Sequence, residues 1–339
     1  MKAAFFREHG GLDVLEYGEL PDPEPAEGWV RVRVKACALN RLDVFVREGW
    51  PGLRLDLPHV GGTDLSGVVD KLGPGVNGVA IGDEVMVNPG LNFEADADGE
   101  QIIPPHPDII GETRAGGLAE YCLVPANRVL PKPAGLSWED AAALPLTCQT
   151  AMQMLRKGRV GPGSRVLIVG AGGGVSVIAV QLAKALGAWV AVTAGGPEKT
   201  ALAKELGADL AIDYKADADW WKTAFKATNK EAFDVVIDSV GARTFGLSLR
   251  TLRNGGRLVT CGATTGPIAE TNIQLVFWKQ LQILGSTMGT PEDLQRALAF
   301  VADGKVRPIV DSVRPLSEIR EAQARMESGE ATGKIVLVP

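Results

Sequence analysis

Residues 168–184 read IVGAGGGVSVIAVQLAK, a stretch that holds Gly170, Gly172, Gly173 and Gly174 within five positions. An apolar run, RVLIV, leads into the glycines, and an apolar, alanine-rich segment follows them. Because glycine costs backbone entropy, such a run indicates a left-handed backbone or a close approach to another object. A strand, a glycine turn and a helix in this order favour the binding of a pyrophosphate group, since backbone N–H groups and the helix dipole point to one place. The alternative is a tight turn that only packs a helix on a sheet.

The match to the dinucleotide motif G-x-G-x-x-G is imperfect, because alanine and serine occupy its first and last positions. The predicted phosphate-binding positions are Ala171, Gly172, Gly173, Gly174, Val175 and Ser176.

A second strand, WVAVTA, follows and ends where NAD enzymes carry an Asp or Glu for the ribose 2′-OH. Ala194 and Gly195 stand there, and Lys199 follows closely. Without a carboxylate to repel a 2′-phosphate, and with a lysine to attract one, the sequence favours NADP over NAD. The alternative for Lys199 is a solvated lysine in the first turn of the next helix.

The composition limits the classes of protein that the chain can belong to. With 339 residues, two domains are expected. The net charge is −6 and no basic run exceeds two residues, which argues against nucleic-acid binding. No apolar signal segment and no stretch of eighteen apolar residues is present, so neither a leader nor a membrane span is expected. Four scattered cysteines favour reduced thiols and a cytoplasmic location.

Two patterns of secondary structure divide the chain. The first third alternates short apolar strands, such as VRVRVKACAL at 30–39, with Pro/Gly turns, which predicts a small antiparallel, barrel-like domain. Residues 88–117 are polar and rich in Pro and Gly, so a long surface loop is expected. From about residue 150, short apolar runs alternate with helical segments, which predicts parallel strands with crossover helices. The fold class is therefore α/β.

These features together resemble the medium-chain dehydrogenase/reductase superfamily over nearly the whole chain. The resemblance rests on the N-terminal strands and on VGPGSRVLIVGAGGGVSVIAVQLAKALGA, FDVVIDSVG and QILGSTMG, which begin at residues 160, 233 and 282. It implies a GroES-like, barrel-type β domain at 1–147 and 290–339. It also implies a Rossmann domain, a doubly wound parallel sheet, at 148–289.

Zinc enzymes of this superfamily carry their catalytic ligands at positions that match Asn40, Thr63 and Leu146. A catalytic zinc needs three N, S or O side chains and an open coordination position, which Asn, Thr and Leu do not supply. The cysteines of the structural zinc lobe are also missing, because no cysteine lies between Cys37 and Cys122. The sequence therefore predicts a protein without a metal.

The motif LNRLDVFVREG, at 39–49, resembles the zinc-independent, quinone oxidoreductase-like branch, in which an Asn at the Asn40 position lines the nicotinamide pocket. Phe45 replaces a tyrosine that many of these reductases have, so water is expected to supply the proton. The resemblance implies an NADPH-dependent enzyme that transfers a hydride to a quinone or an α,β-unsaturated carbonyl compound. Asn40 and Thr63 would donate hydrogen bonds to the substrate oxygen. The further cofactor contacts it implies are Thr150, Gly195, Lys199, Tyr214, Val240, Gly262 and Lys334.

Three alternative functions stay open on the sequence. One is an enoyl-thioester or alkenal reductase on the same scaffold. Another is an alcohol dehydrogenase, which would need a metal that the sequence does not place. The third is a crystallin-like, NADPH-binding protein with a structural or regulatory role.

The segment QLQILGSTMG, at 280–289, is expected to be the last strand of the cofactor sheet and therefore an edge. Related proteins pair this strand with its copy across a two-fold axis, so a homodimer is expected, with a dimer of dimers possible. Phe277 and Trp278 would supply the apolar interface. The alternative is that these two aromatic side chains pack inside their own subunit.

Overall fold

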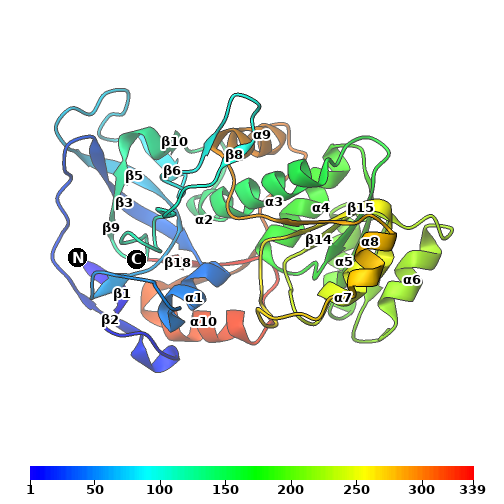
Figure 1. The fold of residues 1–339 in the computed structure, drawn as a ribbon. Coiled ribbons are helices and arrows are strands. Elements are labelled where there is room, and N and C mark those ends of the chain that lie inside the picture. The colour runs from blue at the N-terminus through cyan, green and yellow to red at the C-terminus, as the bar shows by residue number, and fades with distance from the viewer. The chain divides into compact units, whose positions relative to one another are not determined.

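The computed structural model describes residues 1–339, which form two compact units (Figure 1). One unit comprises Met1–Leu146 and Pro308–Pro339, and the other comprises Thr147–Arg307. The sequence had predicted that the second unit ends after residue 289. It ends after residue 307 instead. The reason is helix α9 (Pro291–Ala302), whose Asp293 forms an ion pair with Arg156 of the second unit at 3.0 Å.

The first unit consists mainly of antiparallel sheets, as expected for a GroES-like domain. A seven-stranded sheet has the order β10-β6-β5-β3-β18-β17, with β9 also paired to β3, and a three-stranded sheet has the order β2-β1-β4. The strands are β1 (Lys2–Phe6), β2 (Glu16–Glu19), β3 (Trp29–Ala38), β4 (His59–Val60), β5 (Asp64–Leu72), β6 (Glu84–Val87), β7 (Glu94–Ala95), β8 (Gln101–Ile102), β9 (Tyr121–Pro125), β10 (Val129–Pro131), β17 (Val310–Pro315) and β18 (Lys334–Val338). The helices are α1 (Arg41–Glu48), α2 (Trp138–Ala142) and α10 (Ile319–Glu327), with short 3₁₀ turns at Leu12–Val14, Ala126–Arg128 and Leu316–Glu318.

Strand β3 organises this unit because its side chains alternate between the core and the surface. Val30, Val32 and Val34 are buried, while Arg31 and Arg33 between them point away from the core. This period of two is the pattern of a strand with one buried face. Because β3 pairs with β5, β9 and β18, it brings segments far apart in the chain into one sheet.

The second unit is a six-stranded parallel sheet in the order β13-β12-β11-β14-β15-β16. This is the doubly wound order of a Rossmann domain, with the switch point between β11 and β14. Its strands are β11 (Arg165–Val169), β12 (Trp189–Ala194), β13 (Leu210–Asp213), β14 (Phe233–Asp238), β15 (Leu252–Thr260) and β16 (Gln282–Gly285). Its helices are α3 (Pro145–Gly158, which begins just before the unit boundary), α4 (Gly174–Ala185), α5 (Pro197–Glu205), α6 (Trp220–Ala227), α7 (Phe245–Thr251), α8 (Ile273–Trp278) and α9.

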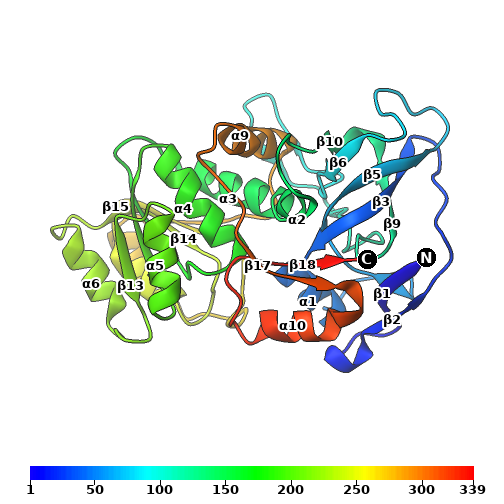
Figure 2. The ribbon, with the colours of Figure 1, turned by 180° about the vertical axis from the view of Figure 1, so that it is seen from behind.

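Helices cover both faces of this sheet, so its central strands are apolar throughout. Figure 2 shows α4 and α5 in front of the sheet, whereas α7 and α8 lie in front of it in Figure 1. Val166, Leu167, Ile168 and Val169 of β11 are accordingly all buried. A continuous apolar run is typical of a parallel strand that is covered on both sides.

Strand β16 is the edge of the sheet, which confirms the sequence prediction. Phe277 and Trp278 of the preceding helix α8 are 61% and 78% exposed, so they do not pack inside their own chain. Ile283 of β16 is also exposed. None of the helices combines the length and apolar character that crossing a membrane would require.

Candidate active site

The glycine turn predicted as a phosphate site lies between β11 and α4, at the carboxyl end of the sheet. Gly170 has a φ of +76°, a conformation that only glycine adopts without strain. A Cβ at Gly172 would lie 2.8 Å from Lys199 Cδ, so the bare glycine leaves room for that side chain. Gly173 is the N-cap of α4 and offers no side chain to the first helical N–H groups. Those N–H groups are suited to an anion.

Ser176 serves the turn itself, because its Oγ donates to Gly170 O at 2.9 Å. Ala171 is fixed by a hydrogen bond from its N–H to Thr193 O on the neighbouring strand β12, at 2.7 Å. These two predicted positions therefore hold the shape of the turn.

The end of β12 gathers basic and aromatic side chains around Gly195. A Cβ at Gly195 would lie 2.5 Å from Tyr214 Oη and 3.3 Å from Lys215 Cε. Asp213 fixes this loop, because its Oδ1 accepts hydrogen bonds from Gly196 N and Lys215 N at 2.9 Å each. These backbone donors lower the pKa of Asp213. The sequence analysis identified Tyr214 but missed Lys215, although it directly follows that tyrosine.

The remaining predicted cofactor positions of the sheet lie at the same carboxyl edge. A Cβ at Gly170 would lie 2.7 Å from Val240 Cγ2, so Val240 sits directly against the glycine turn. Gly262 approaches Ser239 closely, because a Cβ there would lie 2.7 Å from Ser239 O. The structure thus brings Gly170, Val240 and Gly262 together at the ends of β11, β14 and β15.

Two buried hydroxyl groups of the second unit have no hydrogen-bond partner. They are Thr150 Oγ1, on α3, and Ser286 Oγ, directly after β16. A buried polar group without a partner costs about 1–3 kcal/mol, so such groups indicate a missing polar ligand. Thr150 was predicted as a cofactor contact, whereas Ser286 was missed because a lone serine after a strand carries no sequence signal.

A buried polar cluster in the first unit contains Asn40, Asp64 and Lys334. Lys334 Nζ donates to Asn40 Oδ1 at 2.5 Å and to Asp64 Oδ2 at 2.9 Å. Asn40 Nδ2 donates to the same Asp64 oxygen at 2.9 Å, and Leu146 N donates to Asp64 Oδ1 at 2.8 Å. Lys334, predicted as a cofactor contact, therefore binds the predicted pocket residue Asn40.

The second carboxylate near this cluster, Asp43, fixes the turn between β3 and α1. Its two oxygens accept hydrogen bonds from Asn40 N at 2.6 Å and from Gly62 N at 2.9 Å. Burial raises the pKa of Asp43 to about 6, and the two backbone hydrogen bonds oppose that rise. Asp43 thereby holds the loop that carries Thr63 against the turn that carries Asn40.

The two predicted substrate donors, Asn40 and Thr63, differ in whether their side chains already have hydrogen-bond partners in the protein. Asn40 Oδ1 is taken by Lys334, and Asn40 Nδ2 is taken by Asp64, with a long 3.4 Å contact to Ala38 O for its other hydrogen. The Asn40 amide therefore forms its hydrogen bonds mainly with other groups of the protein. Thr63 Oγ1 is fully buried and has no partner.

The three positions that match zinc ligands do not fit a zinc ion. Leu146 contributes only its backbone N–H, Asn40 is bonded to an ammonium group, and Thr63 is neutral. No group of three or more His, Cys, Asp or Glu side chains is placed to hold a metal anywhere in the protein. Lys334 Nζ, which is paired with Asp64, also binds Asn40 Oδ1, so the one oxygen that Asn40 could offer a metal is already bound.

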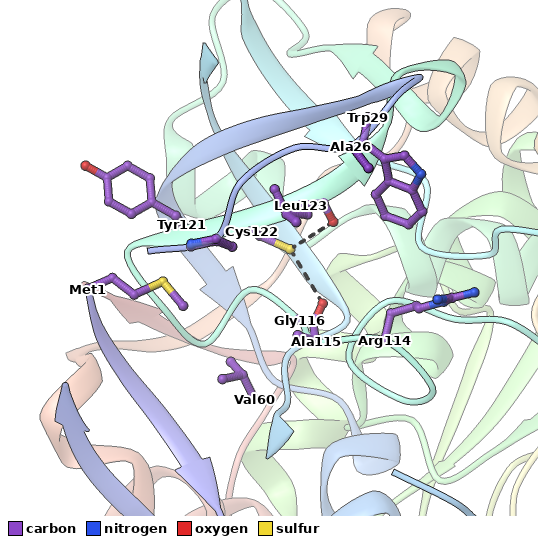
Figure 3. Close-up of a pocket in the computed structure, with 11 residues that line it drawn as sticks. Met1, Ala26, Trp29, Val60, Arg114, Ala115, Gly116, Tyr121, Cys122 and Leu123 are labelled. Atoms are coloured by element: carbon purple, nitrogen blue, oxygen red, sulfur yellow. Dashed lines mark hydrogen bonds between the residues drawn. The ribbon is translucent and has the colours of Figure 1, made fainter. Parts of the chain in front are cut away.

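A cavity of about 290 Å³ in the first unit lies between β9 and the N-terminal segment (Figure 3). Trp29, Tyr121 and Leu123 give it an apolar lining. The guanidinium of Arg114, at its rim, is bound to Asp108 at 3.0 Å. Burial raises the pKa of the Cys122 thiol to about 12, so this thiol is unreactive. The cavity therefore offers no reactive group.

Comparisons with known proteins agree with this arrangement of domains. The family described as "Alcohol dehydrogenase GroES-like domain" matches residues 26–134, and the family described as "Zinc-binding dehydrogenase" matches residues 174–303. Together they cover the greater part of both units.

Three similar proteins illustrate the range of the relatives. An alcohol dehydrogenase of Schizosaccharomyces pombe is 32% identical, over 99% of this chain and 97% of that protein. A 2-methylene-furan-3-one reductase of Solanum lycopersicum is 34% identical, over 100% of this chain and 79% of that protein. The crystal structure of an NAD-dependent alcohol dehydrogenase has a TM-score of 0.95 and 46% identity, and each chain is covered completely.

The fold and its cofactor edge define an oxidoreductase with a GroES-like and a Rossmann domain. The chain belongs to the medium-chain dehydrogenase/reductase superfamily, in which a nicotinamide cofactor is expected.

The misfit of the zinc positions leads to a direct prediction. Purified protein is expected to hold far less than one zinc ion per chain, because Asn40, Thr63 and Leu146 present no set of ligands. Elemental analysis of protein expressed in zinc-supplemented medium measures this, and activity before and after chelation gives the control. Stoichiometric zinc, or activity lost on chelation and regained with zinc, would contradict it.

Proposed function

We propose that this protein is a zinc-independent, NADPH-dependent reductase of quinones or α,β-unsaturated carbonyl compounds. The observation that carries the proposal is the hydrogen-bonded cluster of Asn40, Asp64 and Lys334, because Asn40 is one of the positions that match a zinc ligand. A relative named for reduction of an enone, the Solanum lycopersicum protein, supports the substrate class.

The chemistry of such substrates suits a site without a metal. When bound, dihydronicotinamide supplies a hydride. The negative charge that then develops on a quinone or enone oxygen is delocalised and needs less Lewis-acid help than an alkoxide. Buried hydrogen-bond donors are enough to stabilise it, and Thr63, with its unpartnered hydroxyl, is such a donor.

NADPH as the preferred coenzyme is supported by the surroundings of Gly195. Ala194 ends β12 without a carboxylate, and Lys199, Tyr214 and Lys215 approach Gly172 or Gly195 closely. A 2′-phosphate placed there gains charge-assisted hydrogen bonds, which are stronger than those of a neutral hydroxyl.

Alcohol oxidation with NAD is the second candidate, and the 46% identity to an NAD-dependent alcohol dehydrogenase favours it. It would require a cation to bind the alkoxide, and Lys334 is a cation that is bound to Asn40, one of the zinc positions. Turnover with each class of substrate separates the two candidates.

The decisive experiment measures coenzyme oxidation by the purified protein. We expect loss of NADPH absorbance with a naphthoquinone or an alkenal, unchanged by chelator, and little reduction of NAD⁺ or NADP⁺ with primary and secondary alcohols. Alcohol oxidation without quinone or alkenal reduction would overturn the proposal. NADPH binding without any turnover would favour a structural or regulatory role.

A single substitution tests the coenzyme assignment. Lys199→Ala should weaken NADPH binding about ten- to a hundredfold, since a charge-assisted hydrogen bond contributes about 1.5–3 kcal/mol. NADH affinity should stay nearly constant, because NADH has no 2′-phosphate. Dissociation constants from coenzyme fluorescence measure both effects.

Lys204→Ala is the matched control, because Lys204 lies exposed on the same helix, α5. It should leave both affinities unchanged. Equal losses of NADPH and NADH affinity in Lys199→Ala would refute the assignment.

We also propose that the protein forms a homodimer through strand β16. The edge strand has unpaired backbone groups, and Phe277, Trp278 and Ile283 expose apolar surface beside it. Such an edge pairs with its copy across a two-fold axis, and the aromatic side chains then form the core of the interface.

Light scattering at micromolar concentration tests the assembly. The unmodified protein should have the mass of a dimer or a dimer of dimers, and Trp278→Glu should lower it by placing a charge in the interface. Ile103→Glu, which changes an exposed isoleucine of the first unit, should leave the mass unchanged. A monomeric mass for the unmodified protein would end this proposal.

A further inference from the structure

We propose that the Lys334 ammonium group is a hydrogen-bond donor to the substrate oxygen, so that it takes the electrostatic role of a metal ion in this site. This inference rests on the proposed reductase function and assigns the group that stabilises its developing charge.

The position of Lys334 follows from the register of two strands. Strand β18 pairs antiparallel with β3, with Val336 opposite Ala38. Continuing this register brings Lys334, the first residue of β18, opposite Asn40 at the end of β3. The preceding residue, Gly333, has a φ of +85°, and a Cβ there would lie 2.1 Å from Ile309 O. Only glycine therefore fits directly before β18 without strain.

The ammonium group has one hydrogen more than the protein uses. Its three hydrogens meet two acceptors, Asn40 Oδ1 and Asp64 Oδ2, and Lys334 is only 4% exposed. Buried donors are nearly always satisfied in folded proteins, so a buried ammonium hydrogen without an acceptor indicates an oxygen ligand.

Arg47 shows what a purely structural buried cation looks like in the same unit. It is 1% exposed, and it donates to Gly10 O, to Gln323 Oε1 and to Glu327 Oε1 at 2.7–3.1 Å. Those acceptors are contributed by the N-terminal segment and by helix α10. Lys334, by contrast, has two acceptors, Asn40 Oδ1 and Asp64 Oδ2, for its three hydrogens.

The role of the cation in the reaction can be written with every atom placed. As a hydride reaches the β-carbon of an enone, the electrons of the C=C bond move toward the carbonyl group and its oxygen becomes negative. The Lys334 N–H donates to this oxygen and keeps its proton. Water then protonates the α-carbon, so the substrate gains two electrons and two hydrogens while the coenzyme is oxidised.

Removal of the ammonium group tests this role. Lys334→Met keeps the length of the side chain and should lower kcat for an alkenal about 10²–10³-fold, the loss for one oxyanion donor. The NADPH dissociation constant should change less than twofold. The loss should be smaller for a quinone, because the oxyanion of a quinone is less basic, and Lys334→Arg should recover part of the activity.

A second variant separates the chemical role from stability. Lys334→Met alone leaves Asp64 buried without its cation, which destabilises the fold. Adding Asp64→Asn removes that charge and should restore the melting temperature while kcat stays low. Arg47→Met serves as the control for loss of a structural cation: it should lower the melting temperature but leave kcat of the folded fraction unchanged. Full kcat in the stabilised double variant would overturn the inference.

A binding measurement keeps this test independent of the proposed function. The probe is 4-nitrophenolate, whose oxygen mimics the developing charge, and its absorbance reports binding. The unmodified protein should bind it at least about tenfold more tightly than the stabilised double variant, a difference of about 1.4 kcal/mol. Equal binding would refute the role of Lys334, whereas absent quinone and alkenal turnover with unequal binding would refute only the proposed function.

Discussion

The carboxylate of Asp64 is the contact on which the first unit depends. It is fully buried and accepts hydrogen bonds from Lys334 Nζ, Asn40 Nδ2 and Leu146 N at 2.8–2.9 Å. These donors come from β18, from the turn after β3 and from the start of α3, so one side chain joins segments from both ends of the chain. A buried ion pair contributes little net stability over apolar packing, but removal of one partner costs about 3–5 kcal/mol. Replacement of Lys334 or Asp64 alone would therefore be strongly destabilising, so the two residues have to be present together.

We propose that this constraint also determines the chemistry. The Lys334 ammonium group, held by Asn40 and Asp64, is a fixed and buried positive charge. It stabilises a delocalised oxyanion by donating a hydrogen bond, whereas a zinc ion would bind the oxygen directly and lower its basicity much further. A site of this kind favours acceptors that stabilise much of their own charge. Quinones and enones have this property, and simple alkoxides do not.

The sequence predicted the Rossmann unit well, because its signals are local. The run from RVLIV through the glycines to α4 specifies a strand, a turn and a helix within one segment. Ala194 and Tyr214 lie at the ends of the strands that follow it, and Lys199 lies in the first turn of α5. The positions that match zinc ligands could likewise be identified from local sequence motifs. The partnership of Lys334 with Asn40 could not be predicted, because 294 residues separate them and only the register of β18 on β3 brings them together. The sequence also assigned helix α9 to the first unit, whereas it belongs to the second. The ion pair between its Asp293 and Arg156 joins residues that are far apart in the chain, so the sequence pattern does not predict it.

The superfamily uses one fold for alcohol dehydrogenases and for reductases of conjugated carbonyl compounds, so a few residues must decide the reaction. In this protein those residues are coupled. A cysteine at Asn40 or a histidine at Thr63 would add one metal ligand, but the Lys334 ammonium would remain bound to Asp64 at 2.9 Å, so that this carboxylate oxygen would not be available to a metal. Loss of Lys334 alone would leave Asp64 without a counter-charge. A change between the two chemistries therefore requires the ligands and the lysine to be exchanged together, because each is stable only in the electrostatic surroundings that the others supply.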